Sequence, residues 1–205
     1  MTRAVLWAAM AVAACAQAAL ENQLLRAAEI GDVGQVRAPL EAGANPNLSK
    51  NFSALEAAAA ADYPQVVEEM LKHRPAVNQR DSAGRTALNA LGQSAVGRPG
   101  EDPAEVARLL IAAGADVNAQ DNIYAHTPLH EAPNAASAKV LIAAGAQLNR
   151  GNVKGQMALI LTIDAEVARV LLEAGADKTV RDRQGKTALD LARELELSEK
   201  IALLK

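Results

Sequence analysis

The sequence predicts an all-α repeat solenoid, in which short helical units stack side by side along one axis. Two short motifs recur in phase at intervals of about 30 to 41 residues along a chain of 205 residues. Half of the residues are hydrophobic, yet only 2% are aromatic. This composition favours thin layers of Ala, Leu, Val and Ile between closely packed helices. Charged residues make up 22%, which excludes a wholly disordered chain.

The two motifs define about six repeated units. The later motif, clearest as LIAAGADVN, aligns without gaps at 39–47, 110–118, 141–149 and 171–179. The earlier motif, clearest as TPLHEA, occurs at 53–59, 86–91, 127–132, 157–162 and 187–192. The units span about 20–50, 51–82, 83–121, 122–152, 153–182 and 183–205, within one domain over 19–205.

Local chemistry predicts two helices in each unit. Thr127 supplies a hydroxyl that can cap a helix, and the fixed φ of Pro128 suits the first helical position. Leu129 follows on the apolar face of this short helix, and Gly145 is expected to end the second helix in the left-handed conformation. Since one unit cannot bury its own apolar face, neighbouring units must do so for each other.

The motifs T-P-L-H-x-A and A-G-A-D-V-N, at a period near 33, resemble those of ankyrin repeats over about residues 20–205. The resemblance implies an ankyrin stack of about six helix-turn-helix units joined by β-hairpin loops. It also implies that a protein partner contacts the tips of these loops and the concave face of the first helices.

Three departures from the repeat are expected to alter the local structure. Arg74 and Pro75 stand where Gly-Ala is expected, which predicts a different turn at the end of that helix. Pro133 should end the first helix of its unit early. Segment 92–102, rich in Gly and polar residues, predicts a loop that is either a tolerated insertion or a contact element.

The N-terminus predicts export. A single positive charge at Arg3 precedes an apolar run over 4–15 and the small-x-small pattern at 16–18, which is typical of a signal peptide over residues 1–18. The alternative is a lipoprotein signal over 1–14, with Cys15 becoming the lipidated first residue. Both interpretations place the chain in a bacterial envelope, soluble in the periplasm in the first case and lipid-anchored in the second.

The sequence contains no recognised catalytic motif, so we expect neither an enzyme nor a cofactor. His126 and His130, four residues apart, leave open a metal-dependent or enzymatic protein that also uses the 92–102 loop. The alternative is a structural role, in which His130, the His of T-P-L-H, hydrogen-bonds to neighbouring loops. The site prediction therefore includes no metal ligand and no catalytic residue.

The candidate site is a row of hairpin and first-helix positions that would bind a protein partner. Phe52 and Tyr124 are the aromatic members, and exposed aromatic rings are frequent binding hot spots; alternatively, each ring folds onto its own hairpin. Basic residues along the row suggest an acidic patch on the partner. The predicted partner-binding residues are Lys50, Phe52, Arg85, Tyr124, His126, Lys154, Gln156 and Lys186.

The predicted function is therefore that of a non-catalytic periplasmic protein-interaction module, monomeric and specific for an unidentified protein. Small exported bacterial ankyrin proteins, which this chain resembles, include stress-protection factors and neutralisers of secreted toxins. A host-directed secreted effector is a further alternative. The formal net charge of −3 argues against a nucleic-acid partner, which would need a basic face.

Overall fold

The computed structural model describes residues 3–47, 53–93 and 102–205. In these residues it contains α-helices and one 3-10 helix, η1, and no β-strand. The elements are α1 (Arg3–Ile30), α2 (Val33–Glu41), α3 (Ala54–Ala60), α4 (Pro64–Leu71), η1 (Ala87–Ala90), α5 (Pro103–Ala112), α6 (Ala135–Ala143), α7 (Ala158–Leu161), α8 (Ala165–Glu173), α9 (Ala188–Glu194) and α10 (Ser198–Leu204).

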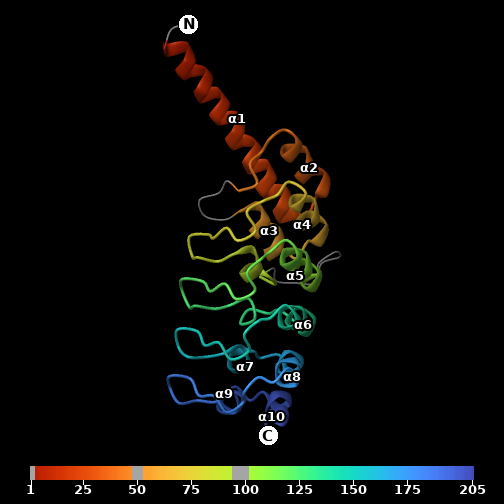
Figure 1. Ribbon diagram of the computed structural model, residues 1–205, viewed down its shortest axis with the longest axis vertical. Coiled ribbons are helices and arrows are strands. Elements are labelled where there is room, and N and C mark those ends of the chain that lie inside the picture. Colours follow the sequence, from red (N-terminus) through yellow and green to blue (C-terminus); the bar gives the residue numbers. More distant parts are fainter. Residues whose placement is uncertain (1–2, 48–52, 94–101) are drawn as a thin grey trace.

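The helices form two parallel rows along an elongated stack (Figure 1). The outer row is α2, α4, α5, α6, α8 and α10, each in contact with the next. The inner row contains the C-terminal half of α1, then α3, η1, α7 and α9, and the hairpin loops project from its other side. This arrangement is the predicted all-α repeat solenoid of about six units.

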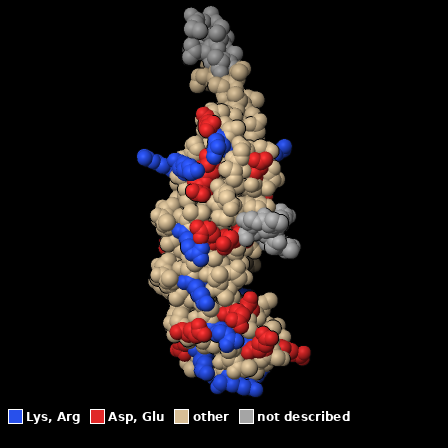
Figure 2. Space-filling view, turned by 90° about the vertical axis from the view of Figure 1, so that its right-hand side faces the viewer, with Lys and Arg blue, Asp and Glu red and all other residues tan. Residues whose placement is uncertain are grey.

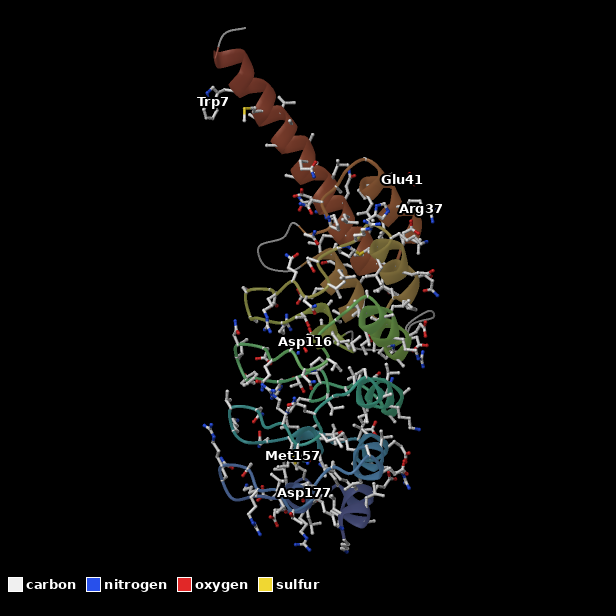
Figure 3. The ribbon with its side chains drawn as sticks, viewed as in Figure 1. Trp7, Arg37, Glu41, Asp116, Met157 and Asp177 are labelled. Carbon is white, nitrogen blue, oxygen red and sulfur yellow. The ribbon has the colours of Figure 1, made fainter. Side chains whose placement is uncertain are left out.

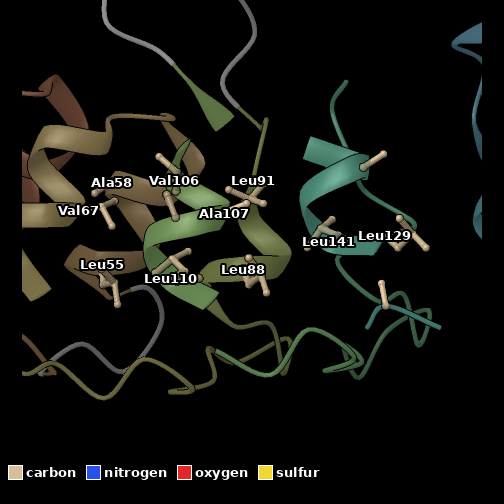
Figure 4. Close-up of a cluster of buried hydrophobic side chains, with 14 of the residues drawn as sticks. Leu55, Ala58, Val67, Leu88, Leu91, Val106, Ala107, Leu110, Leu129 and Leu141 are labelled. Carbon is tan, nitrogen blue, oxygen red and sulfur yellow. The ribbon is translucent and has the colours of Figure 1, made fainter. Parts of the chain in front are cut away.

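The core consists of aliphatic layers between successive units. Figure 4 shows Leu55, Leu88, Val106 and Leu110 meeting in one such layer. The buried hydrophobic side chains in the described part of the chain are Ala, Leu, Val, Ile and Met, with no aromatic ring among them. Because helices lined with Ala approach closely, each layer closes without a large side chain, as the composition predicts.

Polar side chains start several of the helices as the motifs predict. The Ser53 hydroxyl accepts a bond from the Glu56 N–H at 3.1 Å, and that of Thr187 accepts one from the Asp190 N–H at 3.2 Å. Asp102 caps α5 through its carboxylate, which accepts from two backbone N–H groups, with Pro103 at the first helical position. These caps satisfy N–H groups that a helix start would otherwise leave without partners.

The N-terminal helix α1 has two halves of different character. Its C-terminal half packs on α2 and α3, while its N-terminal half projects beyond the stack (Figure 1). Trp7, labelled in Figure 3, is 72% exposed, and Cys15 is exposed as well. No helix of the described residues is long and apolar enough to cross a membrane. The signal peptide and the lipidation of Cys15 remain predictions.

The expectation of a different turn at Arg74 is wrong. Arg74 adopts the left-handed conformation with φ of 51°, as Gly145 does with φ of 92° at the equivalent position. Its N–H bonds to the Leu71 carbonyl at 3.1 Å, matching the bond from Gly145 to Ile142 at 3.0 Å. Pro75 lacks the N–H that bonds back to the helix in other units, so this helix end keeps its shape with one bond fewer.

Two further expectations need correction. The hairpin loops are closed by backbone hydrogen bonds, but within the described residues they contain no strand, because each one reverses after only a few residues. The first helix expected after Thr127 is reduced to a turn, in which His130 N–H bonds to Thr127 O and Glu131 N–H to Pro128 O. Pro133 lacks an N–H group and prevents this turn from continuing as a helix.

Segment 92–102 is anchored at both ends to one residue of the preceding unit. The Gly92 N–H donates to the Asp62 carboxylate at 3.1 Å, and the Asp102 N–H donates to the Asp62 carbonyl at 2.9 Å. A Cβ on Gly92 would lie 2.1 Å from the Cβ of Pro133. Residues 94–101, which include most of the predicted loop, lie outside the described residues.

The solvent-facing side of the outer helices carries charges of both signs, interspersed rather than gathered (Figure 2). Exposed i,i+3 pairs such as Arg108–Glu105 and Arg169–Glu166 contribute little to stability because water screens them. Glu69 is the exception: hydrogen bonds from Arg37 and Lys72 lower its pKa to about 2. Over the described residues of this face, charges of both signs are interspersed.

Candidate protein-binding face

The hairpin edge is the row of loop tips formed by residues 81–85, 121–126, 152–156 and 182–186. Each tip starts with Asp or Asn, whose side chain accepts hydrogen bonds from the backbone of the same loop. The Asp121 carboxylate, for example, accepts from the N–H groups of Ile123, Tyr124 and His126 at 2.7 to 2.9 Å. Such bonds fix the loop backbone locally. The backbone of each tip therefore holds its exposed side chains in defined positions.

Backbone hydrogen bonds also join each tip to the next. The bonds run from Asn122 N to Ala83 O at 2.8 Å, from Val153 N to Tyr124 O at 2.8 Å, and from Arg183 N to Lys154 O at 2.9 Å. Since every described tip takes part, their relative positions are set by the main chain. The hairpin edge is therefore one continuous surface rather than four independent loops.

One position in each tip has a positive φ, and three of these are glycines. In the 121–126 tip this position is Ala125, with φ of 55°. The Gln120 side chain donates to the Ala125 carbonyl at 2.7 Å, just as Arg80 donates to Gly84 and Arg181 to Gly185. This tip is one residue longer than the others, and the same type of side-chain bond holds it in place. The positive-φ residues of the tips are Gly84, Ala125, Gly155 and Gly185.

The two predicted histidines stack on each other, with centroids 5.3 Å apart and planes 2° from parallel. His130 Nδ1 accepts from the Thr127 N–H, and Nε2 donates to the Gln156 carbonyl at 3.0 Å. His126 Nδ1 bonds to the Glu131 carboxylate, while Nε2 accepts from Asn152 at 3.0 Å. Every ring nitrogen of the pair is therefore engaged in protein hydrogen bonds.

This geometry gives the histidines a structural role at the base of the hairpin edge. Burial lowers the pKa of His130, which favours the neutral ring that its hydrogen bonds require. A metal ligand needs a free nitrogen lone pair, and neither ring retains one here. Among the described residues, no group of three or more His, Cys, Asp or Glu side chains is placed to hold a metal ion.

Arg85 lies in a charged cluster at the base of the 81–85 tip. Its guanidinium binds Asp81 from Nε and Nη2, both at 3.0 Å, and lies 3.5 Å from a buried oxygen of Glu56. Burial, together with the neighbouring Asp81 carboxylate, raises the pKa of Glu56 to about 8. Hydrogen bonds from Arg85 contribute to the lowered pKa of Asp81. Near neutral pH, Asp81 is the ionised partner and balances the charge of Arg85.

A pocket of about 380 Å³ opens between the tips and the inner row of helices, in the third and fourth units. It is at the small end of the range of roughly 300 to 1,000 Å³ that is usual for ligand sites. Arg85 donates to the Gln93 side chain at 3.1 Å, and both residues line the pocket. The lining residues are Ala83, Arg85, Asn89, Gln93, Asp121, Ile123, Tyr124 and Glu131.

Next to this pocket lies an exposed apolar area, the tip patch, made of Ile123, Tyr124 and Val153. Their exposed fractions are 56%, 52% and 42%, and the bond between Val153 N and Tyr124 O makes the patch continuous. The Tyr124 ring lies 5.3 Å from His126, tilted by 33°. The ring therefore rests partly on its own hairpin and still presents half of its surface to solvent, which combines both predictions made for it.

The predicted site residues fall into three groups. Lys50 and Phe52 lie outside the described residues. Arg85, Gln156 and Lys186 make contacts within the stack: Gln156 bonds to Asp182, and Lys186 bonds to Glu194 at 2.7 Å. The third group points to solvent or joins the rings beside the pocket, and its members are Tyr124, His126 and Lys154.

The predicted partner-binding residues leave out several residues of this site. Glu56, Asn89 and Glu131 lie on first-helix segments, and Gln93 follows one. Glu56 and Asn89 both stand three residues after the Ser or Thr of the first motif, where His130 stands in its unit. Asn89 uses this place to bond to the Thr86 N–H and to the Ala119 carbonyl, both at 3.1 Å. The position three residues after the Ser or Thr of the first motif thus indicates a polar side chain that faces inward.

Comparison with curated protein sequences finds no match. A model of the family described as ankyrin repeats, in three copies, matches residues 93–182. Among solved structures, the fold is similar to a chain in the complex of the Bd0816 predatory endopeptidase from Bdellovibrio bacteriovorus with immunity protein Bd3460. The TM-score is 0.74 at 25% identity, over 89% of this chain and 96% of that one. The family match covers 93–182, and together with the aligned motifs and the stacked helices it confirms the predicted resemblance to ankyrin-repeat proteins.

Proposed function

We propose that this protein is an exported ankyrin-repeat protein that binds and neutralises an enzyme harmful to the cell that makes it. The observation that carries the proposal is the similarity to a chain from an endopeptidase–immunity protein complex, which extends over almost the whole of both chains. A match of this extent aligns the stack as a unit rather than one repeat. In this proposal the chain acts by occupying its target, without catalysis of its own.

The hairpin edge supports a binding role. Side-chain and main-chain bonds preorganise its backbone, so little conformational entropy is lost when a partner binds. The tip patch places apolar side chains beside a pocket, which is the usual arrangement of an interface centre with its surrounding polar rim. The charges on the outer helices, in contrast, are mixed in sign, and several of them are already paired with each other.

The N-terminal half of α1 supports export. Its apolar side chains Trp7, Met10 and Val12 are each at least 62% exposed and find no partner surface on the stack. A segment that serves as a signal peptide needs no such partner, because it is removed after export. The proposed location is the periplasm, with a lipid anchor at Cys15 as the alternative. Mass spectrometry of the N-terminus of the protein isolated from cells distinguishes the two.

The experiment uses the chain with a C-terminal affinity tag, expressed in the cells that produce it and recovered from their envelope fraction. We expect it to retain an exported hydrolase whose activity falls on addition of an equal amount of the chain. A variant carrying Tyr124→Ala and Val153→Ser should retain the hydrolase at least tenfold less. The matched control, Ile163→Ser, changes an exposed apolar residue away from the hairpin edge.

Two outcomes would contradict the proposal. One is a retained hydrolase that remains fully active when the chain is bound in excess, because binding would then not neutralise it. The other is equal retention by the double variant and by the Ile163→Ser control, because binding would then not involve the hairpin edge.

A further inference from the structure

The charges around the 380 Å³ pocket favour a cationic occupant. The lining residues include one cation, Arg85, and two carboxylates, Asp121 and Glu131. Arg85 is already balanced by Asp81, which it binds through two nitrogens at 3.0 Å. In the described part of the chain, no Lys or Arg side chain pairs with Asp121 or Glu131. The pocket therefore has an excess of negative charge, which disagrees with the acidic partner patch that the basic tip residues suggested.

The two pocket carboxylates differ in how available they are. Asp121 uses both oxygens to accept backbone N–H groups of its own tip. Glu131 bonds to His126 through Oε1 only, and its side chain is 43% exposed. A carboxylate can accept several hydrogen bonds, and those from a charged donor are the strongest. Glu131 thus keeps an oxygen that can accept hydrogen bonds from a cation entering the pocket.

Tyr124 adds a second feature that suits a cation. Its ring lines the same pocket and is held by its hairpin and by the contact with His126. The face of an aromatic ring attracts a guanidinium or ammonium group. A side chain with an apolar stem and a charged end could rest its stem on Ile123 while its end meets Glu131. Of the other polar lining residues, Asn89 is already bonded to Thr86 and Ala119, and the side-chain oxygen of Gln93 accepts from Arg85.

We propose that this pocket binds a Lys or Arg side chain of the protein partner, with Glu131 as its counter-ion and the Tyr124 ring against it. The neighbouring tip patch then contacts apolar residues that flank this basic residue in the partner. The inference rests on the proposed protein-binding function and adds the chemistry by which the partner is recognised. The pocket volume suits one side chain rather than a folded element.

The test is a nuclear magnetic resonance titration of the whole chain with two blocked tripeptides, Leu-Arg-Leu and Leu-Glu-Leu. We expect the Arg peptide to shift the side-chain signals of Asn89 and Gln93, and the Glu peptide to leave them unchanged. Glu131→Gln keeps an acceptor for His126 but removes the charge, and should weaken binding of the Arg peptide about tenfold. Tyr124→Leu should weaken it about threefold, because the aromatic face that attracts the cation is lost.

Glu173→Gln is the matched control, because it makes the same chemical change on an exposed helix end far from the pocket. Equal shifts with both peptides, no shift with either, or Arg-peptide affinity unchanged by Glu131→Gln would each overturn the inference. A preference for the Glu peptide would also overturn it and would assign the pocket to Arg85.

The titration is independent of the proposed neutralising role. If the Arg peptide binds as stated and no hydrolase is retained from the envelope, the pocket assignment stands and neutralisation falls. If a hydrolase is retained and inhibited equally by the chain and by Glu131→Gln, neutralisation stands and the pocket assignment falls.

Discussion

The two long edges of the stack are built in different ways. The hairpin edge repeats one backbone design, with an Asp or Asn at the start of every described tip and a bond from that tip to the next. The turn edge is formed by the connections between the first and second helices, and its described parts are less uniform, although those at 61–63 and 195–197 form the same turn. They lie at 61–63, 92–93 with 102, 132–134, 162–164 and 195–197.

The connections of the turn edge are stabilised in several different ways. Asp62 and Glu196 adopt positive φ values of 55° and 56° without being glycine. In the fifth unit, Lys200 crosses from α10 and donates to the carbonyls of Ile160 and Thr162 at 3.2 and 2.5 Å. Burial lowers the pKa of Lys200 to about 8. The connections of the turn edge are thus stabilised by different hydrogen-bond donors and by residues of positive φ that differ in type from unit to unit.

The two edges differ in the kind of sequence change that they accommodate. On the turn edge, an insertion alters only one connection, and segment 92–102 is such a case. On the hairpin edge, the bonds that join successive tips persist even at the 121–126 tip, which is one residue longer, and the tip side chains can vary because the backbone fixes the loops. Variable side chains on a fixed frame are what a binding surface requires.

The largest expected effect is on the free energy of unfolding, and it differs between two glycines, one on each edge. Gly92 on the turn edge has φ of 70°, and an added Cβ would collide with Pro133; Gly185 on the hairpin edge has φ of 79° and open space around it. Gly92→Ala should lower the free energy of unfolding by about 2 to 5 kcal/mol, because backbone strain and overpacking add. Gly185→Ala should cost about 1 to 2 kcal/mol from strain alone.

Urea unfolding of the two variants beside the unaltered chain measures this difference. Equal losses for the two glycines would show that Pro133 moves aside, and that the turn edge is softer than its contacts indicate.

The next effect concerns pH and the buried carboxyl of Glu56, which lies on α3 beside Arg85 of the hairpin edge. Because the folded chain raises the pKa of Glu56 from 4.5 to about 8, it holds this proton more tightly than the unfolded chain does. The resulting stabilisation is complete below pH 4.5 and is lost as the pH rises through about 8. Glu56→Gln, which cannot ionise, should lose less stability than the unaltered chain over this interval.

Urea unfolding at several pH values checks the prediction, with Glu173→Gln as the control for an exposed carboxyl. Parallel stability curves for Glu56→Gln and the unaltered chain would mean that Arg85 keeps Glu56 ionised in the folded state.

The smallest expected effect on stability, and the sharpest test of the comparison, uses one exposed apolar residue from each edge. Val153 on the hairpin edge is 42% exposed, and Ile163 on the turn edge is 69% exposed. Replacing either by Ser should change the free energy of unfolding by no more than about 0.5 kcal/mol. Only Val153→Ser should reduce retention of the protein partner. Thermal unfolding and the affinity experiment together decide this, and a loss of binding in Ile163→Ser would place the interface on the turn edge.

Much of the fold follows from features that a single unit contains. The caps at Ser53, Asp102 and Thr187 and the left-handed Gly145 depend on neighbours within a few residues, so the motif predicts them. Arg74 shows the limit of this local reasoning. The same turn forms there at the cost of a strained backbone, because packing of the helices on both sides requires it.

The candidate site depends on contacts between units, which the motif does not encode. The sequence placed Arg85 in a tip and suggested a free positive charge, whereas the structure turns it toward Asp81 and Glu56. Glu56 comes from the preceding unit, so its proximity to Arg85 exists only once the units are stacked. The same holds for His130 and Gln156, which meet across two units at 3.0 Å.

Spacing within a repeat was enough to predict the number of units, the second helix of each unit, the aliphatic character of the core and the position of the tips. Tertiary structure alone decided which charges are paired, which ring nitrogens are occupied and where a pocket with an available carboxylate opens. The physical reason is that hydrogen bonding and burial at these positions depend on distances across the stack, between side chains that lie about one repeat apart in the chain.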